Sequence, residues 1–201
     1  MTESQYRTYK IYVGLAFAAV LLSIPLAFVL PVQWSSENGI IENAQVVALI
    51  IAAVFILNAQ PRLPWFQRFC AAGLVLMALR ELSWGRVFFP IGMEDFGPIF
   101  VEMADYKYRV QVYVFISVYI SAMLVVLVRF VPVRRIFFGK QPLAALAVMA
   151  LAALLNFVGD HGYILGKGNG QILEELNELI FYATTPAAML YWLWQQKNPS
   201  G

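Results

Sequence analysis

Cysteine and histidine are almost absent from this sequence, because Cys70 and His161 are the only residues of their kinds. A single cysteine excludes a disulfide within the chain. A single histidine excludes a haem held by two histidines. Charged residues make up only 13% of the chain, whereas about 25% is usual in a soluble domain. The basic residues are scattered over short segments, so the sequence gives no support to nucleic-acid binding.

Apolar residues are correspondingly abundant, at 61% of the 201 residues. A soluble fold of this size could not bury so much apolar surface, whereas lipid can solvate it. A membrane-spanning helix needs about 20 predominantly apolar residues. Six segments qualify, namely residues 11–31, 40–58, 69–89, 108–130, 142–158 and 172–194. The sequence therefore predicts an all-α fold, a single domain of residues 1–201 that forms a bundle of six transmembrane helices.

The loops between these segments differ in basic charge, which predicts the orientation of the chain. On the side of the N-terminus we count nine basic residues, Arg7, Lys10, Arg62, Arg68, Arg129, Arg134, Arg135, Lys140 and Lys197. On the opposite side there are four, Arg86, Lys107, Arg109 and Lys167. We therefore expect a multi-pass membrane protein with both termini in the cytoplasm. The stretch 166–170, which contains three glycines, is expected to be a loop.

Acidic residues show the opposite distribution. Of the twelve acidic residues, only Glu3 falls on the cytoplasmic side in this topology. The other eleven are Glu37, Glu42, Glu81, Glu94, Asp95, Glu102, Asp105, Asp160, Glu174, Glu175 and Glu178. Some of these lie within predicted spans, where ionisable groups usually face a bundle interior or a wet cavity and pair with another group.

The spacing along the helices favours convergence of these groups. Residues three or four apart share one helix face, so Glu174, Glu175 and Glu178 are expected on one side of their helix. We predict a polar cavity in the outer half of the bundle. Its predicted lining is Glu42, Arg80, Glu81, Asp160, His161, Glu174, Glu175 and Glu178.

The acidic helix face and the single histidine allow more than one interpretation. Glu42, Glu174 and Glu175 are candidate ligands of a divalent metal ion, since carboxylates with one imidazole form a plausible ligand set. Alternatively, glutamates at a helix start are simply favoured by the helix dipole. Asp160 and His161 are candidates for an acid–base pair, or for ordinary loop polarity at a helix end.

Two arginines are candidate substrate ligands. Arg80 could hold a lipid phosphate, because its guanidinium suits two-point contact with oxyanions. The alternative is a structural ion pair between Arg80 or Glu81 and the last helix. Arg109 belongs to a basic and aromatic patch that could bind substrate or anchor the chain at the membrane interface.

The segment Arg80-Glu81-Leu82-Ser83-Trp84-Gly85-Arg86 resembles a signature found in a group of bacterial inner-membrane proteins, approximately E-E-x-S-W-G-Q. Those proteins are also similar in having a glutamate early in the second helix, here Glu42. This chain departs from the pattern at Arg80, where glutamate is usual, and at Arg86, where glutamine is usual. The resemblance implies a bacterial multi-spanning protein and draws attention to Glu81 and Trp84. It supplies no reaction.

The leading hypothesis is an enzyme that acts on a lipid or lipid-linked substrate at the outer leaflet. In this hypothesis, His161 or Glu178 is the general base or a metal ligand. Glu81 and Asp160 orient the reacting groups or bind the metal. Arg80, with Trp84 and Arg109, binds substrate. One alternative is a transporter or proton-coupled carrier, although the apolar inner halves of the helices offer no through-path unless a homo-oligomer supplies one. The other is a non-catalytic membrane assembly subunit. Membrane lipids are the expected partners.

Overall fold

The computed structural model of the chain describes residues 1–94, 97–162 and 165–195. Asp95 and Lys197, which entered the charge counts above, lie outside these ranges. The long helices are α1 (Glu3–Leu26), α2 (Ile40–Asn58), α3 (Pro64–Glu81), α4 (Arg109–Phe130), α6 (Leu143–Asp160) and α7 (Gly166–Gln195). The shorter elements are η1 (Val32–Ser35), η2 (Ser83–Phe88), β1 (Pro90–Glu94), β2 (Gly97–Phe100) and α5 (Val133–Phe138).

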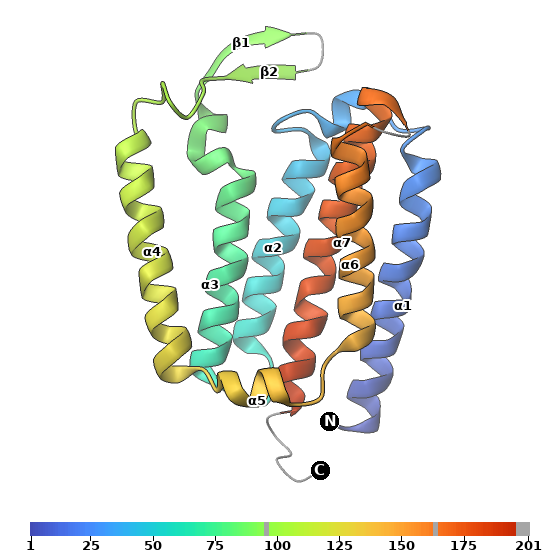
Figure 1. Ribbon diagram of the computed structural model, residues 1–201, viewed down its shortest axis with the longest axis vertical. Helices are drawn as coiled ribbons and strands as arrows, with labels where there is room; N and C mark the ends of the chain where they lie inside the picture. Colours follow the sequence, from blue (N-terminus) through green and yellow to red (C-terminus); the bar gives the residue numbers. More distant parts are fainter. Residues whose placement is uncertain (95–96, 163–164, 196–201) are drawn as a thin grey trace.

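The long helices run side by side in one bundle, with β1 and β2 at one end and α5 at the other (Figure 1). Helix α7 is the central element, because α1, α2 and α6 all pack against it. Helix α3 packs on α2, and α4 packs on α3 at the edge of the bundle. The N-terminus and the end of α7 lie at the same end of the bundle as α5.

Four of these helices are long and apolar enough to cross a membrane, namely α1, α2, α4 and α6. All of α4 lacks buried residues in the isolated chain, as expected for a helix whose surface lipid covers. The mostly helical architecture and the four apolar helices support the predicted membrane location. Helices α3 and α7 are not among the four, and both carry charged residues within their spans.

Helix α3 ends earlier than the sequence analysis predicted. The prediction extended it to residue 89, but its last residue is Glu81. Ser83 and Trp84 have φ values of 45° and 57°, in the left-handed region that side chains other than glycine rarely adopt. Gly85 follows with a φ of 90°. These three residues form the first half of η2 and change the direction of the chain after α3. Trp84 therefore does not share a helix face with Arg80 or Glu81.

The chain after η2 forms a two-stranded antiparallel sheet of β1 and β2, which the all-α prediction missed. The apolar residues of this segment were assigned to a helix end and a loop, because the run is too short to distinguish a strand from a helix by periodicity alone. The sheet lies at the end of the bundle that carries Glu37, Glu42 and Glu81.

The prediction of a loop at residues 166–170 was wrong, because α7 begins at Gly166. Tertiary packing overrides the low helix propensity of glycine here. A Cβ atom on Gly159 of α6 would lie 2.6 Å from the Gly170 carbonyl oxygen of α7. A Cβ atom on Gly170 would likewise lie 2.6 Å from the Gly159 carbonyl oxygen. The two glycines therefore allow α6 and α7 to approach backbone to backbone.

Candidate polar site between α3 and α7

A cluster of charged side chains joins the end of α3 to the middle of α7. Arg80 and Glu81 occupy the last two positions of α3. Glu178 and Tyr182 lie four residues apart in α7, so one turn of helix places them on one face. The ordinary periodicity of two helices thus supplies the four side chains, while the packing of the bundle brings them together.

Arg80 is held between the two carboxylates. Its Nη1 lies 3.1 Å from Glu81 Oε1 and 2.6 Å from Glu178 Oε1. The same nitrogen donates to the Tyr182 hydroxyl at 2.6 Å. Charge-assisted hydrogen bonds of this kind are about twice as strong as those between neutral groups. Arg80 therefore fixes the relative position of α3 and α7 at this level of the bundle.

Tyr182 is the fourth member of the cluster. Its hydroxyl lies 2.7 Å from Glu81 Oε1 and 2.9 Å from Glu178 Oε1. Because a hydroxyl has one proton, it donates to one carboxylate at a time. Glu81 and Tyr182 are buried, with 7% and 3% of their surface exposed, whereas the Arg80 side chain is 59% exposed. The Glu81 and Tyr182 side of the cluster is therefore buried, whereas its Arg80 side is open.

A cavity of about 230 Å³ adjoins this cluster between α3, α6 and α7. Its lining combines polar and apolar side chains: Met77, Arg80, Ala153, Asn156, Asn177, Glu178, Phe181 and Tyr182. Asn177 is fully buried, and its amide nitrogen donates to Ser23 Oγ and to the Leu173 carbonyl oxygen. Its Oδ1 is buried and has no partner among the described residues. The lining of the cavity therefore includes a carboxylate, a guanidinium and amide side chains.

A second set of polar side chains links α7 to α2. Gln45, which is fully buried, donates from Nε2 to Glu175 Oε2 at 2.8 Å and to the Glu175 carbonyl oxygen at 3.0 Å. The Glu42 carboxylate accepts a hydrogen bond from the backbone N–H of Asn38, which lies just before the start of α2. Glu42 lies close enough to Glu81, Glu175 and Glu178 for their charges to interact. The four carboxylates thus share one region with the guanidinium of Arg80.

Only some of the eight predicted lining residues meet in the cavity. Arg80 and Glu178 line it, and Glu81 is hydrogen-bonded at its edge. Asp160 and His161 pair with each other instead, with His161 Nδ1 3.5 Å from Asp160 Oδ2. That histidine nitrogen also lies 3.0 Å from the Phe157 carbonyl oxygen. Neither of these two residues is among the described residues that line the cavity.

The predicted ligands of a metal ion, Glu42, Glu174 and Glu175, are divided between α2 and α7. Glu175 is engaged with Gln45 and Glu42 with the backbone before α2. Among the described residues, no group of three or more His, Cys, Asp or Glu side chains is arranged to hold a metal ion.

Trp84 and Arg109 lie outside the cavity. Trp84 belongs to η2, and Arg109 begins α4 and donates to the Ala104 carbonyl oxygen in the preceding loop. The residues around Trp84 have a clear structural role. Ser83 Oγ donates to Glu37 Oε1 at 3.0 Å, and Arg86 donates to the Val101 carbonyl oxygen at 2.9 Å. The Ser83–Arg86 turn therefore connects the loop before α2 with the loop before α4 at this end of the bundle.

No protein-family model, curated protein or solved structure matches this chain. The resemblance of residues 80–86 to a bacterial inner-membrane signature therefore stays a prediction. Within that segment, the structure separates two roles. Arg80 and Glu81 take part in the charged cluster, whereas Ser83 and Arg86 stabilise the turn that follows.

Sequence reasoning missed Tyr182 and Asn156. Tyr182 carries a usable signal, because it follows Glu178 by four residues and a buried tyrosine hydroxyl requires a partner. Asn156 lies one turn before Asp160 in α6, within an otherwise apolar stretch, and donates to the Glu174 carbonyl oxygen at 3.4 Å. An isolated amide in such a stretch is a signal of the same kind.

Proposed function

We propose that all six long helices span a membrane, with the N-terminus in the cytoplasm of a bacterial cell. The charges within α3 and α7 support this, because Arg80 pairs with Glu81 and with Glu178, and both carboxylates are largely buried. Intramembrane charges are expected to face the interior and to pair in this way. The 18 residues of α3 extend over about 27 Å, close to the hydrocarbon thickness of a bilayer.

We further propose that the chain is an enzyme that acts on a lipid or lipid-linked substrate, and that the cavity between α3, α6 and α7 is its active site. The observation that carries this proposal is the lining of the cavity. Glu178, Arg80 and Asn177 supply polar groups, whereas Met77 and Phe181 supply apolar ones. An amphiphile has the same division between headgroup and chain, so the cavity suits a substrate that arrives from the bilayer.

In this proposal Glu178 is the general base or acid. Its side chain lines the cavity and is 16% exposed, whereas the side chain of Glu81 is 6% exposed. Glu178 can therefore exchange a proton with a hydroxyl or water in the cavity. Arg80 counters the charge on Glu178, and its exposed edge can contact an anionic part of the substrate. The Tyr182 hydroxyl lies within hydrogen-bond distance of both carboxylates and donates to one of them at a time.

The proposal needs neither His161 nor Asp160 in the reaction, because both lie outside the described lining of the cavity. The experiment is a comparison of lipid profiles by mass spectrometry in cells that express the native chain, Glu178→Gln or Glu174→Gln. Glu174 lies one turn before Glu178 in α7 and does not line the cavity. We expect Glu178→Gln to abolish any lipid change that the native chain causes and Glu174→Gln to preserve it. Equal effects of the two variants would contradict the assignment.

A proton-coupled carrier is the second candidate, and the excess of carboxylates favours it. Glu42, Glu81, Glu175 and Glu178 lie near one arginine, and acidic groups within membranes often relay protons. Proteoliposomes with an internal pH dye separate the two candidates. A carrier acidifies or alkalinises the lumen in response to substrate, and Glu178→Gln abolishes that response. An enzyme leaves the internal pH unchanged and alters the lipids.

A further inference from the structure

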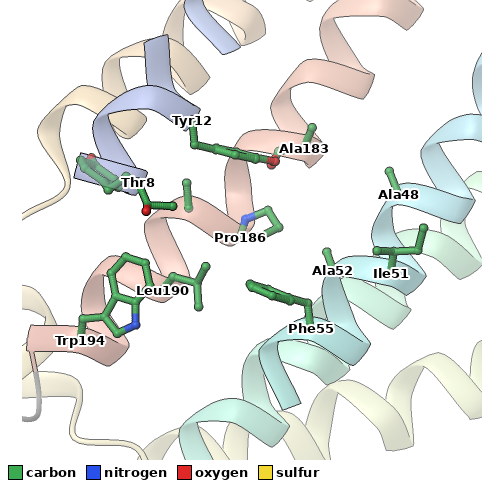
Figure 2. Close-up of a pocket in the computed structure, with 12 residues that line it drawn as sticks. Thr8, Tyr12, Ala48, Ile51, Ala52, Phe55, Ala183, Pro186, Leu190 and Trp194 are labelled. Carbon is green, nitrogen blue, oxygen red and sulfur yellow. The ribbon is translucent and has the colours of Figure 1, made fainter. Parts of the chain in front are cut away.

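A second hollow lies elsewhere in the molecule and shares no lining residue with the candidate active site. It is a groove of about 470 Å³ between α1 and α2, with α7 as its floor. Figure 2 shows Tyr12 on the α1 wall, Ala48 and Phe55 on the α2 wall, and Pro186 and Leu190 on the floor. This volume falls within the range of about 300–1,000 Å³ that is usual for ligand pockets.

A hydrogen bond from α1 to the backbone of α7 crosses the groove near Pro186. A proline within a helix lacks an N–H group, and its ring disturbs the hydrogen bonds of the preceding turn. The Ala183 carbonyl oxygen in that turn accepts a hydrogen bond from the Tyr12 hydroxyl at 2.6 Å. The tyrosine thus satisfies a carbonyl group beside the proline and ties α1 to α7 across the groove. Its own hydroxyl is used in doing so.

A second ring donor in the wall, the indole of Trp194, is also engaged. The indole N–H of Trp194 donates to the Gln60 carbonyl oxygen at 3.0 Å. Most of the remaining lining consists of alanine, isoleucine, leucine and phenylalanine side chains. The groove therefore offers contact surface and almost no hydrogen bonding, which suits an apolar chain and not a polar metabolite. Because α1 and α2 are both long and apolar enough to span a membrane, its mouth would open toward lipid.

The charge at one end of the groove indicates which lipid fits. Arg7 directly precedes Thr8 of the α1 wall, and Arg62 follows Gln60 by two residues. Both arginines are exposed. This end of the bundle is basic, because Glu3 is the only acidic residue there within the described ranges. Basic residues beside a membrane surface attract anionic headgroups.

We propose that the groove binds an acyl chain of an anionic phospholipid whose phosphate lies near Arg7 and Arg62. The inference does not depend on the proposed enzyme activity, because the groove and the cavity have different linings. It also does not depend on which side of the membrane carries the N-terminus, since the headgroup follows the basic end of the bundle.

The test uses the full chain in nanodiscs of phosphatidylcholine with a minor share of phosphatidylglycerol, followed by native mass spectrometry of the released protein. We expect the native chain to retain phosphatidylglycerol. Ile51→Trp and Ala48→Phe place larger side chains in the groove wall and should remove the retained lipid. Ile50→Trp is the matched control, because Ile50 is also exposed on α2 but does not line the groove.

A second pair of variants tests the headgroup contact. Replacing Arg7 or Arg62 with glutamine should lower the preference for phosphatidylglycerol over phosphatidylcholine by about fivefold for each arginine. Arg129→Gln and Arg134→Gln, on α4 and α5, should leave the preference unchanged. Retention that is the same in Ile51→Trp and Ile50→Trp would overturn the proposal. So would a native chain that retains no lipid, or a cross-link through Ala48→Cys that joins two protein copies at the groove.

Discussion

Arg80 and Glu178 are 98 residues apart in the sequence, yet Arg80 Nη1 lies 2.6 Å from Glu178 Oε1. The contact joins the end of α3 to α7, and Glu81 and Tyr182 share it. Both helices carry charges that lower their hydropathy. The pairing gives a physical reason for those charges, because each charged group would be costly if it faced lipid alone.

Removing Arg80 should destabilise the bundle. In Arg80→Gln, Glu81 and Glu178 lose their cationic partner and repel each other at close range. A hydrogen bond to a charged group contributes about 1.5–3 kcal/mol, and the open edge of Arg80 places the effect at the lower end. Thermal unfolding in detergent measures it. The double variant Arg80→Gln with Glu178→Gln should recover part of the loss, and a double variant less stable than Arg80→Gln would contradict the pairing.

Tyr182→Phe should also lower stability, by about 1–3 kcal/mol, because the buried Glu81 carboxylate loses a donor. Tyr113→Phe is the matched control, since Tyr113 is 54% exposed on α4 and a surface change of this kind usually stays within about 0.5 kcal/mol. The unfolding temperatures of the two variants provide the comparison. Equal shifts would show that the Tyr182 hydroxyl contributes nothing to the cluster.

Gly159→Ala should separate α6 from α7. The added Cβ would lie 2.6 Å from the Gly170 carbonyl oxygen and 2.7 Å from the Glu174 nitrogen, and both are backbone atoms that cannot move aside cheaply. We expect a loss of about 1–3 kcal/mol, as for other overpacked sites. Gly14→Ala is the control, because no atom lies within 4 Å of its Cβ position. It should gain up to about 1 kcal/mol. Similar unfolding temperatures for both would refute the close approach.

Arg86→Ala should loosen the sheet of β1 and β2. Arg86 donates to the Val101 carbonyl oxygen just after β2 and to the Ser83 carbonyl oxygen within η2. Without it, we expect faster hydrogen–deuterium exchange in the backbone of Pro90–Glu94 and Gly97–Phe100, with no change in α6. Uniformly faster exchange through the chain would instead indicate a global loss of stability.

Single cysteines test the proposed topology. In a Cys70→Ser background, Glu3→Cys and Glu102→Cys place a thiol at opposite ends of the bundle. In intact cells, a membrane-impermeant maleimide should label Glu102→Cys and leave Glu3→Cys unlabelled until the membrane is opened. Labelling of Glu3→Cys alone would reverse the orientation, and labelling of both would exclude the proposed topology.

Several features could be predicted from the sequence because they depend on local composition. The bounds of α2 were predicted correctly, since an apolar run of 19 residues begins after Gly39 and ends at Asn58. The proximity of Glu81 and Glu178 was predicted from the topology, which places both residues near the outer ends of their spans. The end of α3 was not predicted. Ser83 and Trp84 adopt a left-handed backbone conformation. Serine and tryptophan rarely do so, and therefore nothing in the sequence indicated a turn at these positions.

The sequence by itself determined the apolar helices and the concentration of acid at one end of the bundle, because hydropathy and charge are properties of the residues alone. Only the tertiary structure decided which acids meet. It brings Glu178 to Arg80 and leaves His161 with Asp160. That choice depends on the helix neighbours and on the close contact of Gly159 with Gly170. Rotation and separation of packed helices follow from side chains distant in sequence, and no local pattern encodes them.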